Sequence, residues 1–322
     1  MNRTTAALLT LALAIAFLAS LLLPWASLLD LFGEDRELAT ALLVELRLPR
    51  AALALIYGAT LGASGAAIQA LFANPLASPD LTGTTSGAAL GAVVTAYLLG
   101  FTAPIALSIG AVAGALGALA LLLALAGPRA ETATLLLSGL AISALAGALT
   151  TLALALAPSP FAFYDAYDWL MGSLVDRSLA QTAFAALPAL LTMILLLRLV
   201  RPLDRLALGE DVAQSLGHDV GALRLQVVCL TALGVGACVA ICGAIGFIGL
   251  VAPIFGRRLT GGHPGRAILP AAAIGALLLT AADLVARTAP LGRTLPIGVV
   301  TALLGAPFFL WLVAHMRWRL QS

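Results

Sequence analysis

Residues 81–128 read LTGTTSGAALGAVVTAYLLGFTAPIALSIGAVAGALGALALLLALAGP and carry no charged side chain. This run is too long for a single membrane span, which needs about 20 apolar residues. A break between Gly100 and Pro104 would divide it into a short helix and a complete span. The whole chain is 61% hydrophobic and 10% charged, with a mean hydropathy of +1.07. These values exclude a water-soluble domain and predict an all-α integral membrane protein.

Similar apolar runs extend along the rest of the chain and predict about ten transmembrane helices in one domain, residues 1–322. They cover about residues 4–29, 51–72, 81–100, 104–128, 133–157, 179–199, 223–242, 243–256, 267–286 and 296–315. The third and the eighth are too short to cross a hydrocarbon layer of about 30 Å, so they are expected to lie inside the bundle. Their positions, five helices apart, favour an inverted repeat.

Two connections and one helix face carry more specific patterns. Residues 30–50 form a mixed-charge connection, and residues 161–175 combine aromatic and acidic side chains as interfacial segments do. Within the second apolar run, Gly58 and Gly62 form a GxxxG pattern. Such a pattern lets two helix backbones approach closely in lipid, so this face is expected to pack against another helix.

The densest group of charged residues, 198–224, separates two apolar halves of the chain. Within it, Leu208, Val212, Ala213 and Leu216 are spaced as on a short amphipathic helix, and Gly217 is expected to end that helix in a left-handed conformation. With ten spans and a cytoplasmic N-terminus, most arginines fall on the cytoplasmic side, as the positive-inside rule requires. The stretch is therefore interpreted as a cytoplasmic surface that meets a soluble partner.

The types of residue present restrict the chemistry that this chain can perform. It contains no lysine, and all 17 residues of the lysine-plus-arginine total are arginines. A P-loop needs a lysine that reaches the nucleotide phosphates, so ATP is not expected to bind here by that route. Cys229, Cys238 and Cys242 have no histidine or acid nearby in the sequence and are interpreted as packing residues. No catalytic, metal or cofactor site is predicted.

Asp283 is the only acid deep within a predicted span. An intramembrane acid is a candidate for function, but Arg287 follows one helical turn later and indicates an ion pair that closes the helix end. A transporter driven by an ion gradient usually needs more buried ionisable sites than this. An ion-coupled secondary transporter is therefore a remote alternative, and the energy source is expected to lie in another protein.

Short motifs are distributed over nearly the whole chain. They are residues 46–50 (LRLPR), 64–72 (SGAAIQALF), 74–83 (NPLASPDLTG), 86–88 (SGA), 169–173 (WLMGS), 208–210 (LGE), 215–217 (SLG), 246–253 (GFIGLVAP), 282–287 (ADLVAR) and 295–309 (LPIGVVTALLGAPFF). Together they resemble the FecCD-type iron-chelate permeases of ABC importers, which include the cobalamin permease. Three positions depart from the family pattern: Ala252 and Ile254 stand where valine and histidine are usual, and Thr294 stands where glutamate is usual.

The resemblance implies a type II ABC importer permease, a ten-helix subunit that dimerises with a second copy or a close paralogue around a central pathway. Two cytoplasmic ATPase subunits, which hold ATP and Mg²⁺, would bind below it, and a soluble binding protein would dock above. No nucleic acid partner is expected. The chain would be a multi-pass protein of the bacterial inner membrane with both termini in the cytoplasm. The preferred cargo is an iron chelate, a ferric siderophore, with haem and cobalamin as alternatives.

The resemblance also implies roles for particular residues. A loop of about residues 201–221 would couple the permease to the ATPase, and cations at the outer rim would receive an acidic binding protein, unless they anchor the chain at lipid headgroups. Hydroxyl groups would line the pathway and its gate. The expected residues are Leu208, Gly209, Glu210, Asp211, Ala213, Leu216 and Gly217 for coupling, Arg47, Arg50 and Arg287 for docking, Thr60, Ser64, Ser86 and Ser143 for the pathway, and Thr132 for the gate.

Overall fold

The computed structural model describes residues 2–127, 132–288 and 295–321, with only the backbone described for residues 25–28, 31, 132 and 312–321. All regular elements in these residues are helices. In chain order they are α1 (Arg3–Leu22), α2 (Trp25–Glu34), α3 (Arg36–Ala41), the π-helix η1 (Leu42–Arg47), α4 (Leu48–Leu71), the 3₁₀-helix η2 (Pro79–Thr82), α5 (Thr84–Tyr97), α6 (Pro104–Ala126), α7 (Thr132–Ala155), α8 (Pro160–Leu170), α9 (Leu179–Arg198), α10 (Val200–Leu206), α11 (Glu210–Ser215), α12 (Val220–Cys242), α13 (Ile248–Leu259), α14 (Ile268–Thr288) and α15 (Ile297–Gln321).

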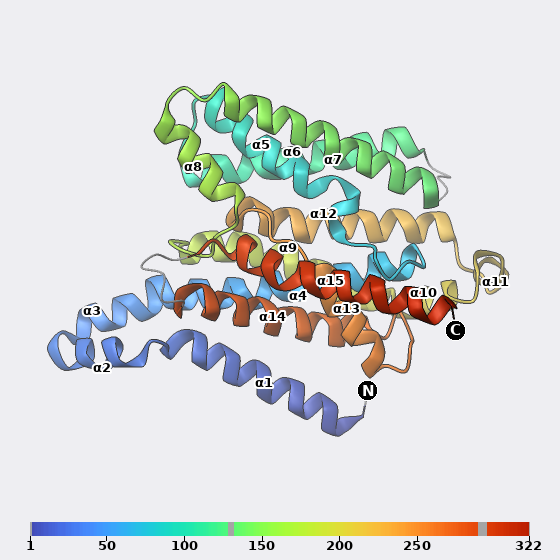
Figure 1. Cartoon of the computed structure of the whole chain (residues 1–322), viewed down its shortest axis with the longest axis horizontal. Coiled ribbons are helices and arrows are strands. Elements are labelled where there is room, and N and C mark those ends of the chain that lie inside the picture. Colours follow the sequence, from blue (N-terminus) through green and yellow to red (C-terminus); the bar gives the residue numbers. More distant parts are fainter. Residues whose placement is uncertain (1, 128–131, 289–294, 322) are drawn as a thin grey trace.

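The long helices lie side by side along the long axis of the molecule (Figure 1). One end of this bundle carries α10 and α11, on the right of the figure, and is called the α11 end below. The opposite end carries α2, α3 and α8 and is called the α8 end. The helices α5, α6 and α7 form one side of the bundle, and α1 lies at the other edge.

Seven helical segments in the described residues are long and apolar enough to cross a membrane. They are α1, the continuous segment Arg36–Leu71, α6, residues Ala133–Ala155 of α7, α9, α12 and α14. The described apolar part of α15, Ile297–Trp311, is shorter. The prediction of an all-helical membrane protein is thus supported, whereas the count of ten spans stays a prediction.

Three predicted helix boundaries were wrong, one of them the start of α13, which begins at Ile248 instead of Gly243. The second span begins at Arg36 instead of Ala51, because α3, η1 and α4 join where a mixed-charge connection was expected. Pro49 lies in the first turn of α4, where a missing N–H is tolerated, and the π-helical η1 links that turn to α3. The first helix ends at Leu22 and not at Leu29, since Pro24 disfavours helical backbone in the residue before it.

Glycines bring α4 into close contact with α14. A side-chain carbon added at Gly58 would lie 2.4 Å from the carbonyl oxygen of Gly275, and one added at Gly62 would lie 2.1 Å from that of Ala271. Real side chains do not fit at such distances, so only glycine permits this approach of the two backbones. The close packing predicted from the GxxxG pattern is confirmed.

The two short helices restart after breaks within the bundle, as the sequence predicted. α5 follows the 3₁₀-helix η2 and packs on α6 and α7, and α13 follows the end of α12 and packs on α4 and α14. The first residues of α13, Ile248–Pro253, are buried. Surrounding helices therefore shield helix ends that lipid could not satisfy.

Both ends of the long helix α12 are stabilised by hydrogen bonds. At the α11 end, Oδ1 of Asp219 accepts a hydrogen bond from the backbone N–H of Ala222 at 2.9 Å and caps the helix. At the other end, the backbone N–H of Ser173, in the loop after α8, donates to the carbonyl oxygen of Cys242 at 2.8 Å. One end of α12 therefore follows α11 directly in the chain, and the other end is hydrogen-bonded to the loop after α8.

Candidate functional site

The segment at the α11 end is a short helix between two glycines. Gly209 and Gly217 have φ angles of 108° and 83°, which are in the range that favours glycine. The backbone N–H of Gly217 donates to Gln214 at 2.9 Å, and that of His218 donates to Ala213 at 3.1 Å. These bonds close α11, so the predicted left-handed end at Gly217 is confirmed.

An apolar strip on this segment faces away from the bundle. Leu208 is 65% exposed, Val212 44% and Leu216 50%, and these three residues are called the coupling patch below. Ala213, which the spacing grouped with these three residues, instead lies on the opposite face, fully buried in the same core cluster as Leu206 of α10. The segment is therefore amphipathic, as predicted, with its larger apolar side chains on the outside.

Polar contacts fix the orientation of α11 relative to its neighbours. Glu210 forms an ion pair with Arg224 of α12, and the guanidinium of Arg205 in α10 lies 2.5 Å from Nε2 of His218. Glu210 is 48% exposed at its side chain, and Asp211 is exposed as well. Contacts with α10 and α12 thus hold the segment that carries the coupling patch, although an ion pair that is open to solvent on one side contributes little free energy.

At the α8 end, one buried carboxylate is shared by two arginines. Asp283 is fully buried, and its Oδ1 accepts a hydrogen bond from Nε of Arg50 at 2.8 Å and forms an ion pair with Nη2 of the same guanidinium, also at 2.8 Å. Its Oδ2 pairs with Arg287 one helical turn later, which confirms the predicted ion pair. Sequence reasoning missed the partner Arg50, because it lies 233 positions away and no local pattern connects the two residues.

Arg287 and a third arginine, Arg47, also hold the end of α1. Arg287 donates to the carbonyl oxygen and to Oγ of Ser20, at 2.9 and 2.8 Å. Arg47 donates to the carbonyl oxygens of Leu21 and Leu22 at 2.9 and 3.0 Å. These carbonyls have no partner within the helix, so the guanidinium groups cap it. The side chains of Arg50 and Arg287 are only 16% and 9% exposed, and the docking role of the three arginines stays a prediction.

The predicted pathway residues fall into two environments. Thr60 and Ser64, on α4, are 2% and 0% exposed, and Oγ1 of Thr60 donates to the carbonyl oxygen of Ile56 at 2.7 Å. Ser86 and Ser143 are half-buried, and Oγ of Ser143 donates to the Asp80 carbonyl oxygen at 3.3 Å. The side chain of the expected gate residue, Thr132, lies outside the described residues. The pathway assignment stays a prediction for all of them.

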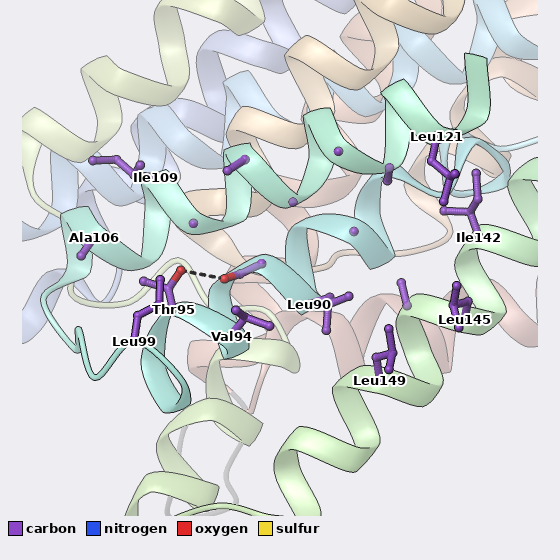
Figure 2. Close-up of a pocket in the computed structure, with 18 of the residues that line it drawn as sticks. Leu90, Val94, Thr95, Leu99, Ala106, Ile109, Leu121, Ile142, Leu145 and Leu149 are labelled. Atoms are coloured by element: carbon purple, nitrogen blue, oxygen red, sulfur yellow. Dashed lines mark hydrogen bonds between the residues drawn. The ribbon is translucent and has the colours of Figure 1, made fainter. Parts of the chain in front are cut away.

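A large apolar cavity lies between α5, α6 and α7, with a volume of about 800 Å³. Figure 2 shows leucine, isoleucine and valine side chains from the three helices around it, among them Leu90, Ile109 and Leu145. The hydroxyl of Thr95 also lines it, but that group donates to the carbonyl oxygen of Gly91 at 2.8 Å, as the dashed line marks. Such a wall offers apolar contact without a fixed charge, and it has no ligands for a metal ion.

Comparison with known proteins identifies the group to which this architecture belongs. The sequence pattern of the FecCD transport family matches residues 6–315. The chain belongs to the FecCD transport family. Its FecCD relatives include the vitamin B12 import system permease protein BtuC of Shigella boydii, which is 41% identical over 318 residues and matched over 95% of each chain. The Fe(3+) dicitrate transport system permease protein FecD of Escherichia coli is 39% identical, with 96% of this chain and 97% of FecD covered.

A solved structure supports the FecCD fold over nearly the full length. It is described as an inward-facing conformation of a metal-chelate type ABC transporter, and it is 32% identical to this chain with a TM-score of 0.87. The match covers 98% of this chain and all of the other. This FecCD chain therefore has the helix arrangement of that transporter. The names of the two relatives give different cargoes, vitamin B12 for BtuC and ferric dicitrate for FecD.

Proposed function

We propose that this chain is the translocation subunit of an ATP-driven importer for a metal chelate, with a ferric siderophore as the preferred cargo. The coupling patch is the observation that carries the proposal. It offers three exposed apolar side chains, Val212 on α11 and Leu208 and Leu216 on either side of it, and an ion pair connects this segment to α12. Such a compact apolar surface suits a groove in a soluble ATPase. ATP and Mg²⁺ would be held by that ATPase.

The complete assembly would contain two permease copies, or this chain and a close paralogue, with two ATPase subunits at the α11 end. That end would face the cytoplasm of a bacterial cell, and a binding protein would dock at the α8 end. The weakly binding apolar walls suit a cargo that must leave as well as enter. Affinity for the cargo would then reside in the binding protein.

Cobalamin is the second candidate cargo, and haem the third. The similarity to vitamin B12 permeases, at 41% identity, is as high as the similarity to ferric dicitrate permeases, at 39%. The permease residues described above contain no group that separates these cargoes by charge or coordination. The choice between them therefore rests on transport measurements.

Reconstitution with the ATPase and the binding protein tests the proposal. We expect uptake of labelled ferric siderophore into proteoliposomes only when ATP is present, and parallel assays with haem and cobalamin assign the cargo. The purified permease alone is expected to hydrolyse no ATP, since the chain has no lysine for a P-loop. Uptake by the permease alone, driven by an ion gradient, would contradict the proposal and favour a secondary transporter.

The variant Gly217→Val is expected to lose ATPase association or transport while still inserting into the membrane. Valine at a φ of 83° is strained by about 1 kcal/mol or more, so the chain would leave α11 in a different direction. An added side chain meets no atom within 4 Å there, so the effect comes from the backbone and not from a clash.

Co-purification of the ATPase and uptake in vesicles measure the effect of Gly217→Val. The matched control is Gly217→Asn, which tolerates a left-handed backbone and should retain most of both activities. Wild-type association and uptake in the valine variant would mean that this loop is an ordinary connection.

Arg47→Gln is expected to weaken docking of the binding protein, more strongly at low salt, because ions screen long-range attraction. Arg47 is preferred to Arg50 for this test, since removing Arg50 would leave buried Asp283 with one partner fewer. Arg36, an exposed arginine of α3, provides the control Arg36→Gln. Equal docking affinities of wild type and Arg47→Gln at low ionic strength would leave Arg47 as a cap of α1 alone.

A further inference from the structure

A second, smaller pocket lies at the α8 end, between α8, the last residues of α5 and the first residues of α6. Its volume is about 360 Å³, which is within the range of small-molecule sites. The lining includes three aromatic residues, Tyr97, Phe161 and Trp169, and one carboxylate, Asp165. Among the described residues that line it, Asp165 is the one charged side chain.

One face of α8 forms the wall of this pocket. Phe161, Asp165 and Trp169 follow each other at intervals of four residues, so they lie one above another on the same side of the helix. The hydroxyl of Tyr97 donates to the carbonyl oxygen of Ala162 at 2.6 Å and fastens α8 to α5. The pocket is thus built from helices that are bonded to each other.

The exposed carboxylate of Asp165 has no counter-ion among the described residues. In the described part of the chain it takes part in no ion pair and no side-chain hydrogen bond. An interfacial aromatic belt would account for the rings of α8 but does not require a carboxylate between them. A single carboxylate also supplies too few oxygens for Ca²⁺ or Mg²⁺, which are bound by several ligands.

We propose that this pocket binds an organic ammonium group. Aromatic rings attract a weakly hydrated cation through their negative faces, and a carboxylate at the same wall supplies the opposite charge. Thr102 and Ser159, which also line the pocket, add hydroxyl groups beside it. The ammonium could belong to a zwitterionic lipid headgroup or to a water-soluble amine, and neither case depends on the importer function proposed above.

Choline and its uncharged tert-butyl analogue provide a direct test. The purified full-length permease, in nanodiscs of phosphatidylglycerol, is titrated with each compound, and saturation-transfer NMR follows their methyl protons. We expect saturable binding of choline and binding of the neutral analogue weaker by about tenfold or more. The absence of saturable choline binding, or equal affinity for both compounds, would overturn the proposal.

Two variants on the same helix locate the site. Asp165→Asn is expected to weaken choline binding by about tenfold, whereas Asp168→Asn should leave it unchanged. Both acids of α8 are exposed, but only Asp165 lines the pocket. Circular dichroism and thermal melting verify that both variants are folded. An equal effect of the two substitutions would show general charge attraction and overturn the assignment to this pocket.

The composition of the nanodisc distinguishes the two sources of the ammonium group. If a lipid headgroup occupies the pocket, replacing phosphatidylglycerol with phosphatidylcholine should reduce choline binding through competition. If the natural ligand is a water-soluble amine, choline should bind equally in both nanodiscs. Either result, together with a loss of binding in Asp165→Asn alone, supports an ammonium site.

Discussion

Gly62→Val is expected to prevent most of the protein from folding into a stable, monodisperse form. The first carbon of the new side chain would lie 2.1 Å from the carbonyl oxygen of Ala271, so α4 and α14 would have to move apart. The contact between α4 and α14 runs along two of the buried spans. Moving these helices apart would remove their packing contacts over much of their length. Overpacking a well-packed core costs about 1–3 kcal/mol, and a clash with backbone belongs at the upper end of that range or above it.

Size-exclusion yield in detergent and the thermal melting temperature measure this effect. Gly147→Val is the matched control, because Gly147 lies in another membrane helix, α7, where an added carbon meets no atom within 4 Å. The control should behave as wild type. A Gly62→Val protein with wild-type yield and melting temperature would show that the α4–α14 contact is not as close as described.

Asp283→Ala is expected to lower the free energy of unfolding by about 3–5 kcal/mol, because it leaves two arginines without their buried carboxylate. The loss should be larger than for removal of an exposed acid, where ion pairs contribute about 1 kcal/mol or less. Arg287 would keep its bonds to Ser20, so the main cost falls on Arg50.

A double variant separates the cost of an unpaired charge from that of lost packing. Asp283→Leu combined with Arg50→Leu removes both members of the pair and should melt at a higher temperature than Asp283→Ala. Thermal melting in the same detergent compares the three proteins. If Asp283→Ala alone melts like wild type, this cluster does not stabilise the α8 end.

The positions of most helices could be predicted from apolar runs and from the residues that punctuate them. Pro104, for instance, begins α6 where the break in the opening stretch was expected, and Gly217 ends α11 in the predicted conformation. The start of the second span could not, because a proline in a first helical turn and a proline in a connection look alike in the sequence. The π-helix that joins α3 to α4 has no sequence signal of its own.

Less of the candidate sites could be predicted, because their geometry depends on residues far apart in the chain. The spacing of Leu208, Val212 and Leu216 predicted an amphipathic segment, but only the fold determines that these side chains are exposed while Ala213 is buried. Arg50 and Asp283 meet through the contact of α4 with α14. The pocket beside Asp165 likewise needs α5 and α6 to close it, so the aromatic and acidic pattern of α8 suggested only an interfacial segment.

The hydrogen bonds at the two ends of α12 have a consequence for how movement would pass through the protein. Its 23 residues extend for about 35 Å, which is enough to cross a hydrocarbon layer of about 30 Å. A displacement imposed on α11 by a neighbouring protein would reach α12 through the short connection of residues 216–219, whose last residue, Asp219, caps the first turn of α12. From there the bond to Ser173 passes it to the connection that follows α8. α12 can therefore carry a displacement from the α11 end of the bundle to the α8 end.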